Sequence, residues 1–224
     1  MIAFAACIAS RCKLAAFAAP GLRRAMEPDS VFAELETDGS IHEAYNEALD
    51  HFAGADGLEA LVLLHEDTEL LDADFCDRVR NALRDPSIAI AGAVGAAGVS
   101  SLRWWEGAIA GRAAEPRGVV EGAPAPCAVD CVDGLLMALS PWAVANLRCD
   151  SERFTGFHGY DADLCFSARA AGRRVVVGEL NVFHHTKGGY GDAASFAAAD
   201  AAFRAKWGQQ QVDQQLRVAA NAVA

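Results

Sequence analysis

Residues 61–67 read Leu61-Val62-Leu63-Leu64-His65-Glu66-Asp67, and the interpretation of the whole chain starts from them. Four consecutive apolar residues are typical of a strand buried on both faces, as in the parallel sheet of an α/β protein. The apolar run ends abruptly in a histidine and two carboxylates. Because ligands of open α/β sheets bind beyond the carboxyl ends of the strands, this polar cluster indicates a functional site.

The spacing within this cluster permits a metal site. His65 and Asp67 are two residues apart, so on a continuing strand their side chains share a face and Glu66 points away. These two residues could reach one divalent ion or a metal bound to phosphate. Acidic residues are also favoured at helix N-termini, so the triplet could instead cap a following helix. Spacing alone leaves both interpretations open.

The composition indicates a globular protein and excludes some partners. The chain has 224 residues, which is long enough for a substantial core, and 53% of them are hydrophobic. The formal net charge of -11 argues against a nucleic-acid partner, since such a surface requires clustered Lys and Arg. It does not exclude nucleotide phosphates, which acidic proteins often hold through a metal ion.

The cysteines and the apolar runs suggest a cytoplasmic location. Seven cysteines lie at irregular positions, and only Cys127 and Cys131 are close together. This pattern predicts free thiols in a reducing compartment. No apolar run approaches the ~20 residues of a membrane-spanning helix, so no transmembrane segment is expected. The apolar start precedes its basic residues, which is the wrong order for a signal peptide, and is interpreted as a buried strand from Ile2 to Ile8.

Strand and helix signals alternate along the chain, which predicts parallel βαβ units. We expect strands at 2–8, 31–35, 61–64, 88–94, 129–139, 175–177 and 182–183, and helices at 41–52, 74–83, 141–147, from about 161, and at 193–207. Ser40 and Glu43 form a capping box before the first of these helices. The segment containing Pro20, Gly21 and Pro28 is expected to be a loop, and Gly208 is expected to end the last helix.

The stretch from Gly95 to Pro126 shows no clear periodicity and is also expected to be a loop. Loops of this length in compact domains are usually functional. Trp104 and Trp105 lie in its middle. They could stack on a sugar ring, form an interface with a partner or with a second copy of the chain, or pin the loop to the body of the protein.

Five motifs follow one another in the order seen in one enzyme family. They are Asp38-Gly39-Ser40 with Ala44-Tyr45-Asn46, Leu64-His65-Glu66-Asp67, Val132-Asp133-Gly134, the run from Phe157 to Leu164, and Val182-Phe183-His184. Together they resemble glycosyltransferases of the GT-A fold, within the large family two. The resemblance is to the subgroup whose metal-binding Asp-x-Asp motif begins with His.

The resemblance implies a fold and a domain organisation. It implies one α/β domain over residues 1–224, with a central, mostly parallel sheet flanked by helices. Residues 1–94 would form the nucleotide-binding half and residues 95–207 the acceptor-side half. Residues 208–224 would form a tail.

The resemblance also implies roles for individual residues. The metal, Mn²⁺ or Mg²⁺, would be bound by His65, Asp67 and His184. Asp161 would be the catalytic base, and Asp163 would be a second catalytic or acceptor-positioning group. The donor would contact Asp38, Asn46 and Glu66. Lys187 begins a glycine-rich segment that could meet the diphosphate or could be an ordinary exposed turn. His184 is followed by His185, and only one of these adjacent side chains should reach the ion.

Two positions depart from the family pattern. Tyr160 stands where the family commonly has Glu, and His65 replaces a carboxylate in the metal motif. A neutral imidazole lowers the negative charge of the site and suits Mn²⁺ better than Mg²⁺.

The expected function is that of a metal-dependent, inverting glycosyltransferase. Its donor would be a nucleotide-diphosphate sugar, and its acceptor a saccharide, a lipid-linked molecule or a small molecule. A nucleotidyltransferase is an alternative, although the segment after the first strand, Ser10 to Lys13, is basic without glycine. A non-catalytic nucleotide-sugar-binding module is the other. The departures at His65 and Tyr160 keep this alternative open, whereas Asp161 and Asp67 speak against it.

Overall fold

The computed structural model describes the backbone of residues 1–36, 39–188 and 191–222, and the side chains in these ranges up to residue 208. The central element is a seven-stranded sheet with the order β2-β1-β3-β11-β5-β12-β9. Its strands are β1 (Ile2–Cys7), β2 (Val31–Leu35), β3 (Ala60–Leu64), β5 (Ile88–Gly92), β9 (Cys127–Val129), β11 (Leu136–Leu139) and β12 (Arg174–Val177).

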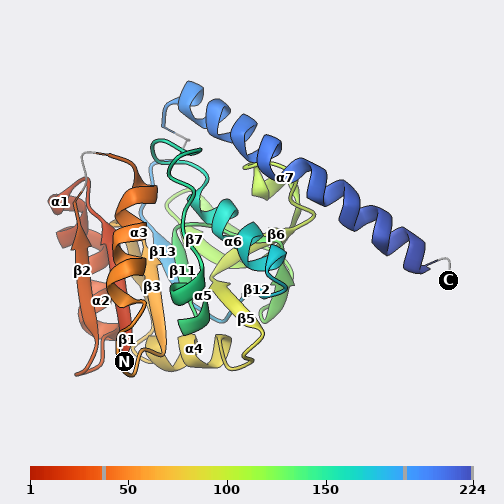
Figure 1. Cartoon of the computed structure of the whole chain (residues 1–224). Helices are drawn as coiled ribbons and strands as arrows, with labels where there is room; N and C mark the ends of the chain where they lie inside the picture. Colours follow the sequence, from red (N-terminus) through yellow and green to blue (C-terminus); the bar gives the residue numbers. More distant parts are fainter. Residues whose placement is uncertain (37–38, 189–190, 223–224) are drawn as a thin grey trace.

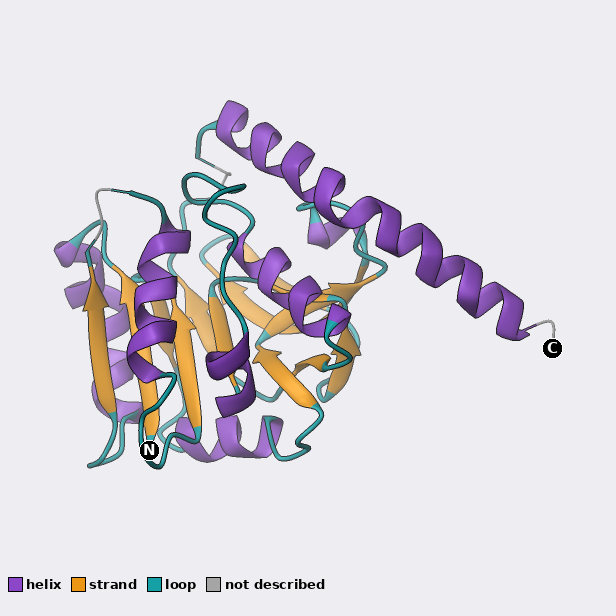
Figure 2. Cartoon of the chain, viewed as in Figure 1, coloured by secondary structure: helices purple, strands orange, loops and turns teal. Residues whose placement is uncertain are grey.

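Most of this sheet is parallel, as the sequence predicts. β1 pairs in parallel with β2 and with β3, and β5 pairs in parallel with β12. Two strands run in the opposite direction. β11 lies between β3 and β5 and is antiparallel to both, and β9 is antiparallel to β12. In Figure 2 the arrowheads of neighbouring parallel strands point toward the same edge of the sheet. All five residues of β3 are buried, as expected for a strand covered on both faces.

A second sheet corrects the expected loop over 95–126. Its order is β10-β6-β7-β13-β4, and β8 pairs with β7. The strands are β4 (Thr68–Leu70), β6 (Val94–Ala97), β7 (Ala108–Glu115), β8 (Gly118–Glu121), β10 (Cys131–Val132) and β13 (Val182–His184), and the short 3-10 helix η2 (Trp104–Glu106) precedes β7. The expected single strand over 88–94 is two strands, β5 and β6, in different sheets.

Close backbone contacts explain why the sequence hides these strands. A Cβ on Gly95 would lie 2.2 Å from the carbonyl O of Cys131, and one on Gly122 would lie 2.0 Å from that of Ile109. Glycine is therefore needed where the chains approach. Small residues at such positions remove the apolar alternation by which a strand is normally recognised.

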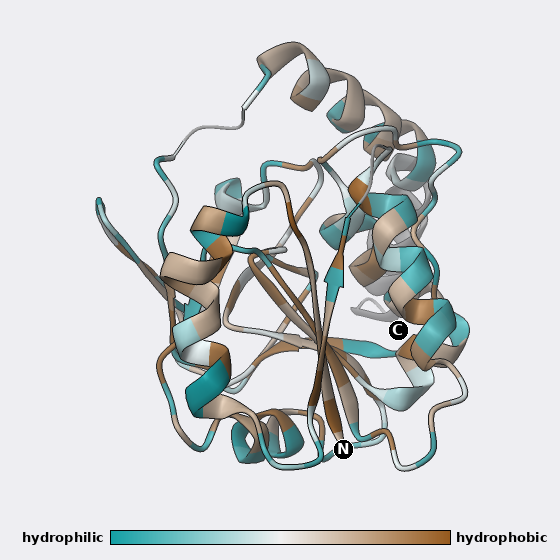
Figure 3. Cartoon of the chain, turned by 90° about the vertical axis from the view of Figure 1, so that its left-hand side faces the viewer, coloured by the Kyte–Doolittle hydropathy of each residue, from teal (hydrophilic) through white to brown (hydrophobic). Residues whose placement is uncertain are grey.

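The helices lie on both faces of the main sheet, and apolar residues are concentrated between the layers (Figure 3). The helices that follow β2 are α3 (Ile41–Phe52), α4 (Phe75–Ala82), α5 (Pro141–Asn146), α6 (Tyr160–Ala170) and α7 (Ala193–Ala222). The C-terminal end of α7 extends past the sheets (Figure 1). The capping box of α3 is present, with Ser40 and Glu43 bonding each other's backbone N–H groups. No helix in the described part of the chain combines the length and the apolar character needed to span a membrane.

Two expectations about helices are wrong. The segment after β1 is not a loop but α1 (Arg11–Lys13), the π-helix η1 (Leu14–Ala18) and α2 (Ala19–Ala25). Pro20 lies in the first turn of α2, where the missing N–H costs no hydrogen bond. Gly208 does not end the last helix, because α7 continues to Ala222 (Figure 1). A glycine inside a helix costs only about 1 kcal/mol, and the Ala and Gln residues around it are good helix formers.

Candidate active site

The 61–67 stretch ends in a turn that joins the two sheets. β3 stops at Leu64, and the N–H of Thr68 donates to the carbonyl O of His65 at 3.0 Å. β4 begins at Thr68 and pairs antiparallel with β13, so that Thr68 is opposite His184. This pairing places Asp67 and His184 together although 117 positions separate them. The alternative in which 65–67 caps a helix is wrong, since a strand follows.

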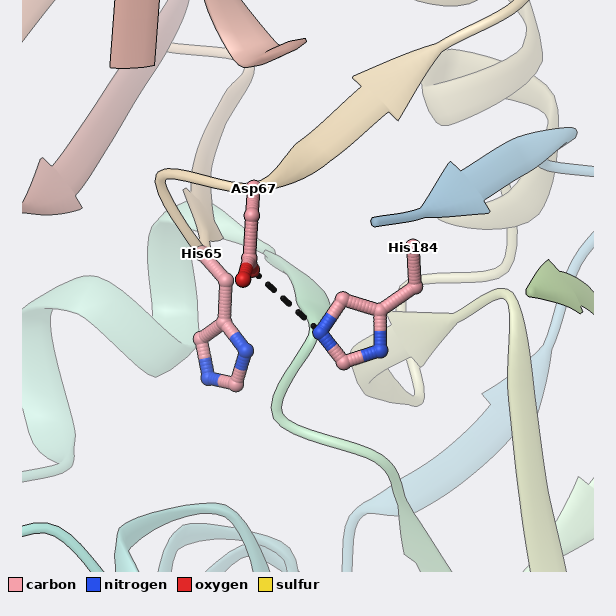
Figure 4. A group of neighbouring side chains, drawn as sticks. All are labelled: His65, Asp67 and His184. Atoms are coloured by element: carbon pink, nitrogen blue, oxygen red, sulfur yellow. Dashed lines mark ion pairs between the residues drawn. The ribbon is translucent and has the colours of Figure 1, made fainter. Parts of the chain in front are cut away.

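His65, Asp67 and His184 form a candidate metal site (Figure 4). One ligand atom from each lies within 4.8 Å of those of the other two. Oδ1 of Asp67 is 3.3 Å from Nε2 of His184. Two imidazole nitrogens and one carboxylate oxygen are a donor set that suits Mn²⁺ and other transition metals, so the residues fit the ion expected from the sequence. His185 binds Glu69 at 3.0 Å instead, so His184 is the histidine of the triad.

The pKa values within the triad follow from burial and from the neighbouring charges. Burial, together with the charge of His184, lowers the pKa of His65 to about 3, so its imidazole is neutral. Burial is the largest single influence on Asp67 and His184, but their mutual hydrogen bond and the neighbouring charges together outweigh it. The pKa of Asp67 falls below its ordinary value, and the pKa of His184 rises above its own.

His184 has a second carboxylate nearby. Among the described residues its buried Nδ1 has no hydrogen-bond partner, and Oε1 of Glu115 on β7 is 3.7 Å away. Metal-binding histidines commonly direct their other ring nitrogen toward a carboxylate, which orients the ring. Glu115 is therefore placed to support His184 from behind.

Asp161 lies at the start of α6, in the same cavity as the triad. The N-cap of α6 is Gly159, whose φ of 96° turns the chain sharply into the helix. Oδ2 of Asp161 accepts from the N–H of Gly134 at 3.0 Å. Burial, and then the charge of Asp133, raise the pKa of Asp161 to about 6. A carboxylate with this pKa is charged at neutral pH and is still basic enough to accept a proton.

The cavity has a volume of about 880 Å³ and lies at the carboxyl edge of the main sheet. One part of its wall is charged and carries the triad with Lys13, Glu115, Arg117, Asp133 and Asp161. Another part is aromatic, with Trp104, Trp105, Phe157, His158 and Phe196. Trp104 is buried, whereas Trp105 is partly exposed and lies 6.2 Å from the ring of Phe196. The tryptophan pair thus both fixes its segment to the body and lines the cavity.

Glu66 lines the same cavity but is not part of the triad. Its Oε2 accepts from the backbone N–H groups of Ala9 and Ser10 at 2.8 and 2.7 Å. It therefore holds the loop after β1 against the cavity. Lys13, on α1 beyond this loop, extends its Nζ to within 3.4 Å of Oδ2 of Asp67.

The side chains of two other residues expected in the site form hydrogen bonds outside the cavity. The side-chain amide of Asn46 makes two hydrogen bonds to the backbone of Cys149, at 2.9 and 2.7 Å. Asp163 is fully buried, accepts from Nε1 of Trp207 at 2.9 Å and pairs with Nζ of Lys206 at 2.8 Å. Neither Asn46 nor Asp163 lines the cavity. We therefore infer that both act by holding helices in place.

Two expected donor contacts remain predictions. Lys187 is exposed, and it lies between Thr186 and Gly188, which both line the cavity. Asp38 lies outside the described residues.

The cavity also holds functional candidates that sequence reasoning did not assign. Asp133, Glu115 and Lys13 line it, and Tyr160 bonds His65. The Asp133-Gly134 dipeptide between two apolar runs was a usable signal, because such a dipeptide marks a turn at the end of a strand. Glu115 carried no signal, since it lies in a stretch without periodicity.

Comparison with known proteins agrees with this geometry. Residues 23–194 match a family described as glycosyltransferase-like. The streptomycin biosynthesis protein StrF of Streptomyces griseus is 29% identical over 191 residues, which are 84% of this chain and 68% of StrF.

Two solved glycosyltransferase structures share the fold. GalNAc-T7 with UDP, GalNAc and Mn²⁺ has a TM-score of 0.59 at 10% identity, over 89% of this chain and 46% of that one. The mannosyltransferase PcManGT from Pyrobaculum calidifontis, in complex with GDP-Man and Mn²⁺, has a TM-score of 0.55 at 15% identity, over 84% of this chain and 58% of that one. The chain spans about half the length of each. Because the family match covers most of its residues, the chain belongs to the glycosyltransferase-like family and has the GT-A fold.

Proposed function

We propose that the protein is a metal-dependent, inverting glycosyltransferase that moves a sugar from a nucleotide-diphosphate donor to an acceptor hydroxyl. The observation that carries the proposal is the position of Asp161 and of the His65–Asp67–His184 triad in one cavity. A metal site can offset the charge of a departing diphosphate, and a separate carboxylate can accept the proton of an attacking hydroxyl, so together they suit this reaction.

His65, Asp67 and His184 would hold the divalent ion. When bound, such an ion offsets the negative charge that develops on the departing diphosphate. Two imidazole ligands favour Mn²⁺ over Mg²⁺, which prefers oxygen ligands. The two solved glycosyltransferase structures described above contain Mn²⁺, which supports this choice.

Lys13 would contribute a second positive charge on the donor side. Its Nζ lies between Oδ2 of Asp67 at 3.4 Å and Oε1 of Glu66 at 3.7 Å. An ammonium group beside the triad can bond a diphosphate oxygen, and a charged hydrogen bond of this kind is worth about 1.5–3 kcal/mol.

Asp161 would accept the proton of the acceptor hydroxyl as that hydroxyl attacks the sugar. The N–H of Gly134 holds its Oδ2, so the carboxylate keeps its orientation without a bound acceptor. If the activated hydroxyl attacks on the face opposite the departing diphosphate, as the family resemblance implies, the reaction is one displacement that inverts the anomeric carbon. The aromatic wall with Trp105, Phe157 and Phe196 offers flat apolar surface for the acceptor, as sugar rings require.

The seven cysteines are free, which supports a reducing, cytoplasmic compartment. The family match favours sugar transfer over nucleotidyl transfer. The charged Asp161 and the complete triad favour an enzyme over a binding module.

The test is product formation from a panel of nucleotide-diphosphate sugars, each with simple acceptors and Mn²⁺. Hydrolysis of the donor by water, which many transferases carry out slowly, is followed as well. We expect one donor to be consumed, with loss of the reaction on addition of EDTA and in Asp161→Asn. Turnover that persists in EDTA would overturn the metal role, and turnover that persists in Asp161→Asn would overturn the assignment of the base.

A further inference from the structure

The hydroxyl of Tyr160 lies between a triad residue and a backbone carbonyl. It is 2.7 Å from Nε2 of His65 and 2.8 Å from the O of Gly134. The hydroxyl has one proton, and a carbonyl oxygen can only accept. Tyr160 must therefore donate to Gly134 and accept from His65. This arrangement requires the proton of the neutral His65 ring to be on Nε2.

The second nitrogen of His65 is then free of a proton and faces the other triad residues. In Figure 4 one ring nitrogen of His65 is directed toward Asp67 and His184, and the other points away from them. Because Nε2 is bonded to Tyr160, the inward nitrogen is Nδ1. A neutral imidazole binds a metal through its unprotonated nitrogen, and the bond made by the other nitrogen decides which one that is.

The tyrosine itself is held rigidly. Its side chain is buried, and its ring meets that of Tyr45 edge-on at 5.1 Å. A Cβ on residue 134 would lie 2.1 Å from the Tyr160 hydroxyl, so Gly134 is needed for the hydroxyl to reach the backbone. The same glycine donates its N–H to Asp161. One peptide segment thus anchors both Tyr160 and the proposed base.

We propose that Tyr160 is a positioning residue, which holds His65 in the orientation and tautomer needed to bind the metal through Nδ1. The proposal rests on the metal site proposed above and adds to it a residue outside the 65–67 motif. It also gives one reason for both departures from the family pattern. His65 replaces a carboxylate of the metal motif, and the hydroxyl of Tyr160, the other departure, bonds that histidine.

The first test measures Mn²⁺ binding to the metal-free protein by calorimetry or by the EPR signal of free Mn²⁺. Tyr160→Phe keeps the ring and removes the hydroxyl, and we expect its affinity for Mn²⁺ to fall about tenfold or more, as for other groups that orient metal ligands. Tyr45→Phe is the matched control, because it removes a neighbouring hydroxyl that donates to the carbonyl O of Leu64 and lies within hydrogen-bonding reach of Tyr160, but that makes no hydrogen bond to His65. Its affinity should stay within about threefold of the wild type, because the hydrogen bond between Tyr160 and His65 is kept.

The second test separates positioning from general packing. In a His65→Ala background, Tyr160→Phe should cause no further loss of Mn²⁺ affinity, because there is no imidazole left to orient. The ¹⁵N NMR spectrum of the metal-free wild type should show His65 protonated at Nε2, and Tyr160→Phe should give a mixture of tautomers.

The outcomes distinguish this proposal from the proposed function. Unchanged Mn²⁺ affinity in Tyr160→Phe would overturn the positioning role and leave the metal site intact. An equal loss in the His65→Ala background, or in Tyr45→Phe, would also overturn it. A wild-type protein that binds no Mn²⁺ would overturn both proposals.

Discussion

At the scale of single residues, Asp161 determines how the activity should depend on pH. Burial and the charge of Asp133 raise its pKa to about 6. Only the carboxylate can accept the acceptor's proton, so kcat should rise with pH through about 6 and level off above 7. Replacing a general base usually costs about 10²–10⁴-fold, and we expect this loss in Asp161→Asn. A pH–rate profile checks the first expectation, and a flat profile between pH 5 and 8 would contradict it.

The raised pKa of Asp161 also makes the stability of the protein depend on pH. A carboxyl group whose folded-state pKa is raised above its ordinary 3.8 stabilises the fold at low pH, and this contribution is lost as the pH rises through about 6. Asn carries no charge at any pH. We therefore expect the stability of Asp161→Asn relative to wild type to increase by roughly 2 kcal/mol between pH 4 and pH 7.5, after allowance for partial exposure. Urea unfolding at the two pH values measures this difference, and a decrease would show that the carboxylate stabilises the fold.

Lys13 should affect how tightly the donor binds. If its ammonium group binds the donor diphosphate, Lys13→Met should raise the donor KM about tenfold or more, since a charged hydrogen bond is lost. Arg11→Met is the matched control, because Arg11 lies on the same short helix but pairs with Glu34 and Glu36. Initial rates over a range of donor concentrations give both KM values. Equal effects of the two substitutions would indicate only a general loss of positive charge.

At the scale of elements, Asp163 tests how α7 is attached. Asp163 on α6 is fully buried and holds Lys206 and Trp207 of α7. Breaking such a contact leaves buried partners unpaired, so Asp163→Ala should destabilise the protein by roughly 3 kcal/mol. Asp150→Ala is the control, because Asp150 binds the same Lys206 but is partly exposed, and it should cost less.

The measurement for Asp163 is thermal unfolding combined with activity. A loss of roughly 3 kcal/mol corresponds to a fall in Tm of about 6–12 °C for a chain of this length. Below its transition, the variant should retain kcat within a few-fold, since Asp163 does not line the cavity. A much lower kcat at unchanged Tm would restore the catalytic role that the sequence suggested.

The elements also show what could be predicted from the sequence. β3 and α3 were predictable, because a buried apolar run and a capping box are local signals. The strands β6 to β8 were not, since their glycines and alanines reflect close contacts with segments distant in sequence, such as Gly95 with Cys131. His184 was predictable only through the family resemblance. Its approach to Asp67 depends on the register of β13 against β4, which no local pattern specifies.

The contacts of Asn46 and Asp163 were not predictable for a related reason. Both occupy motifs associated with the site, and each lies on a helix that borders it. Their side chains nevertheless bond Cys149 and Trp207, and those partners are known only once the helices are packed. Motif order thus indicated which segments surround the cavity, and the packing determined which side chains enter it.

At the scale of the whole molecule, the two sheets meet at the cavity, so bound ligand should stabilise the entire fold. The triad takes His65 and Asp67 from the turn between β3 and β4, and His184 from β13 of the second sheet. An ion bound by all three therefore connects the central sheet to the second one. A ligand present at 100 times its Kd adds about 2.7 kcal/mol to the free energy of unfolding.

A thermal-shift screen of nucleoside diphosphates, each with and without Mn²⁺, tests this expectation. One diphosphate should raise Tm by about 5–10 °C at that concentration, and it should do so only when Mn²⁺ is present. In Asp67→Asn the shift should disappear, because the carboxylate ligand of the triad is lost. In Asp161→Asn it should remain, because the proposed base contacts the acceptor and not the diphosphate. A shift that is independent of Mn²⁺ would place nucleotide binding outside the triad, and the metal-dependent mechanism would then fail even if the protein transfers sugar.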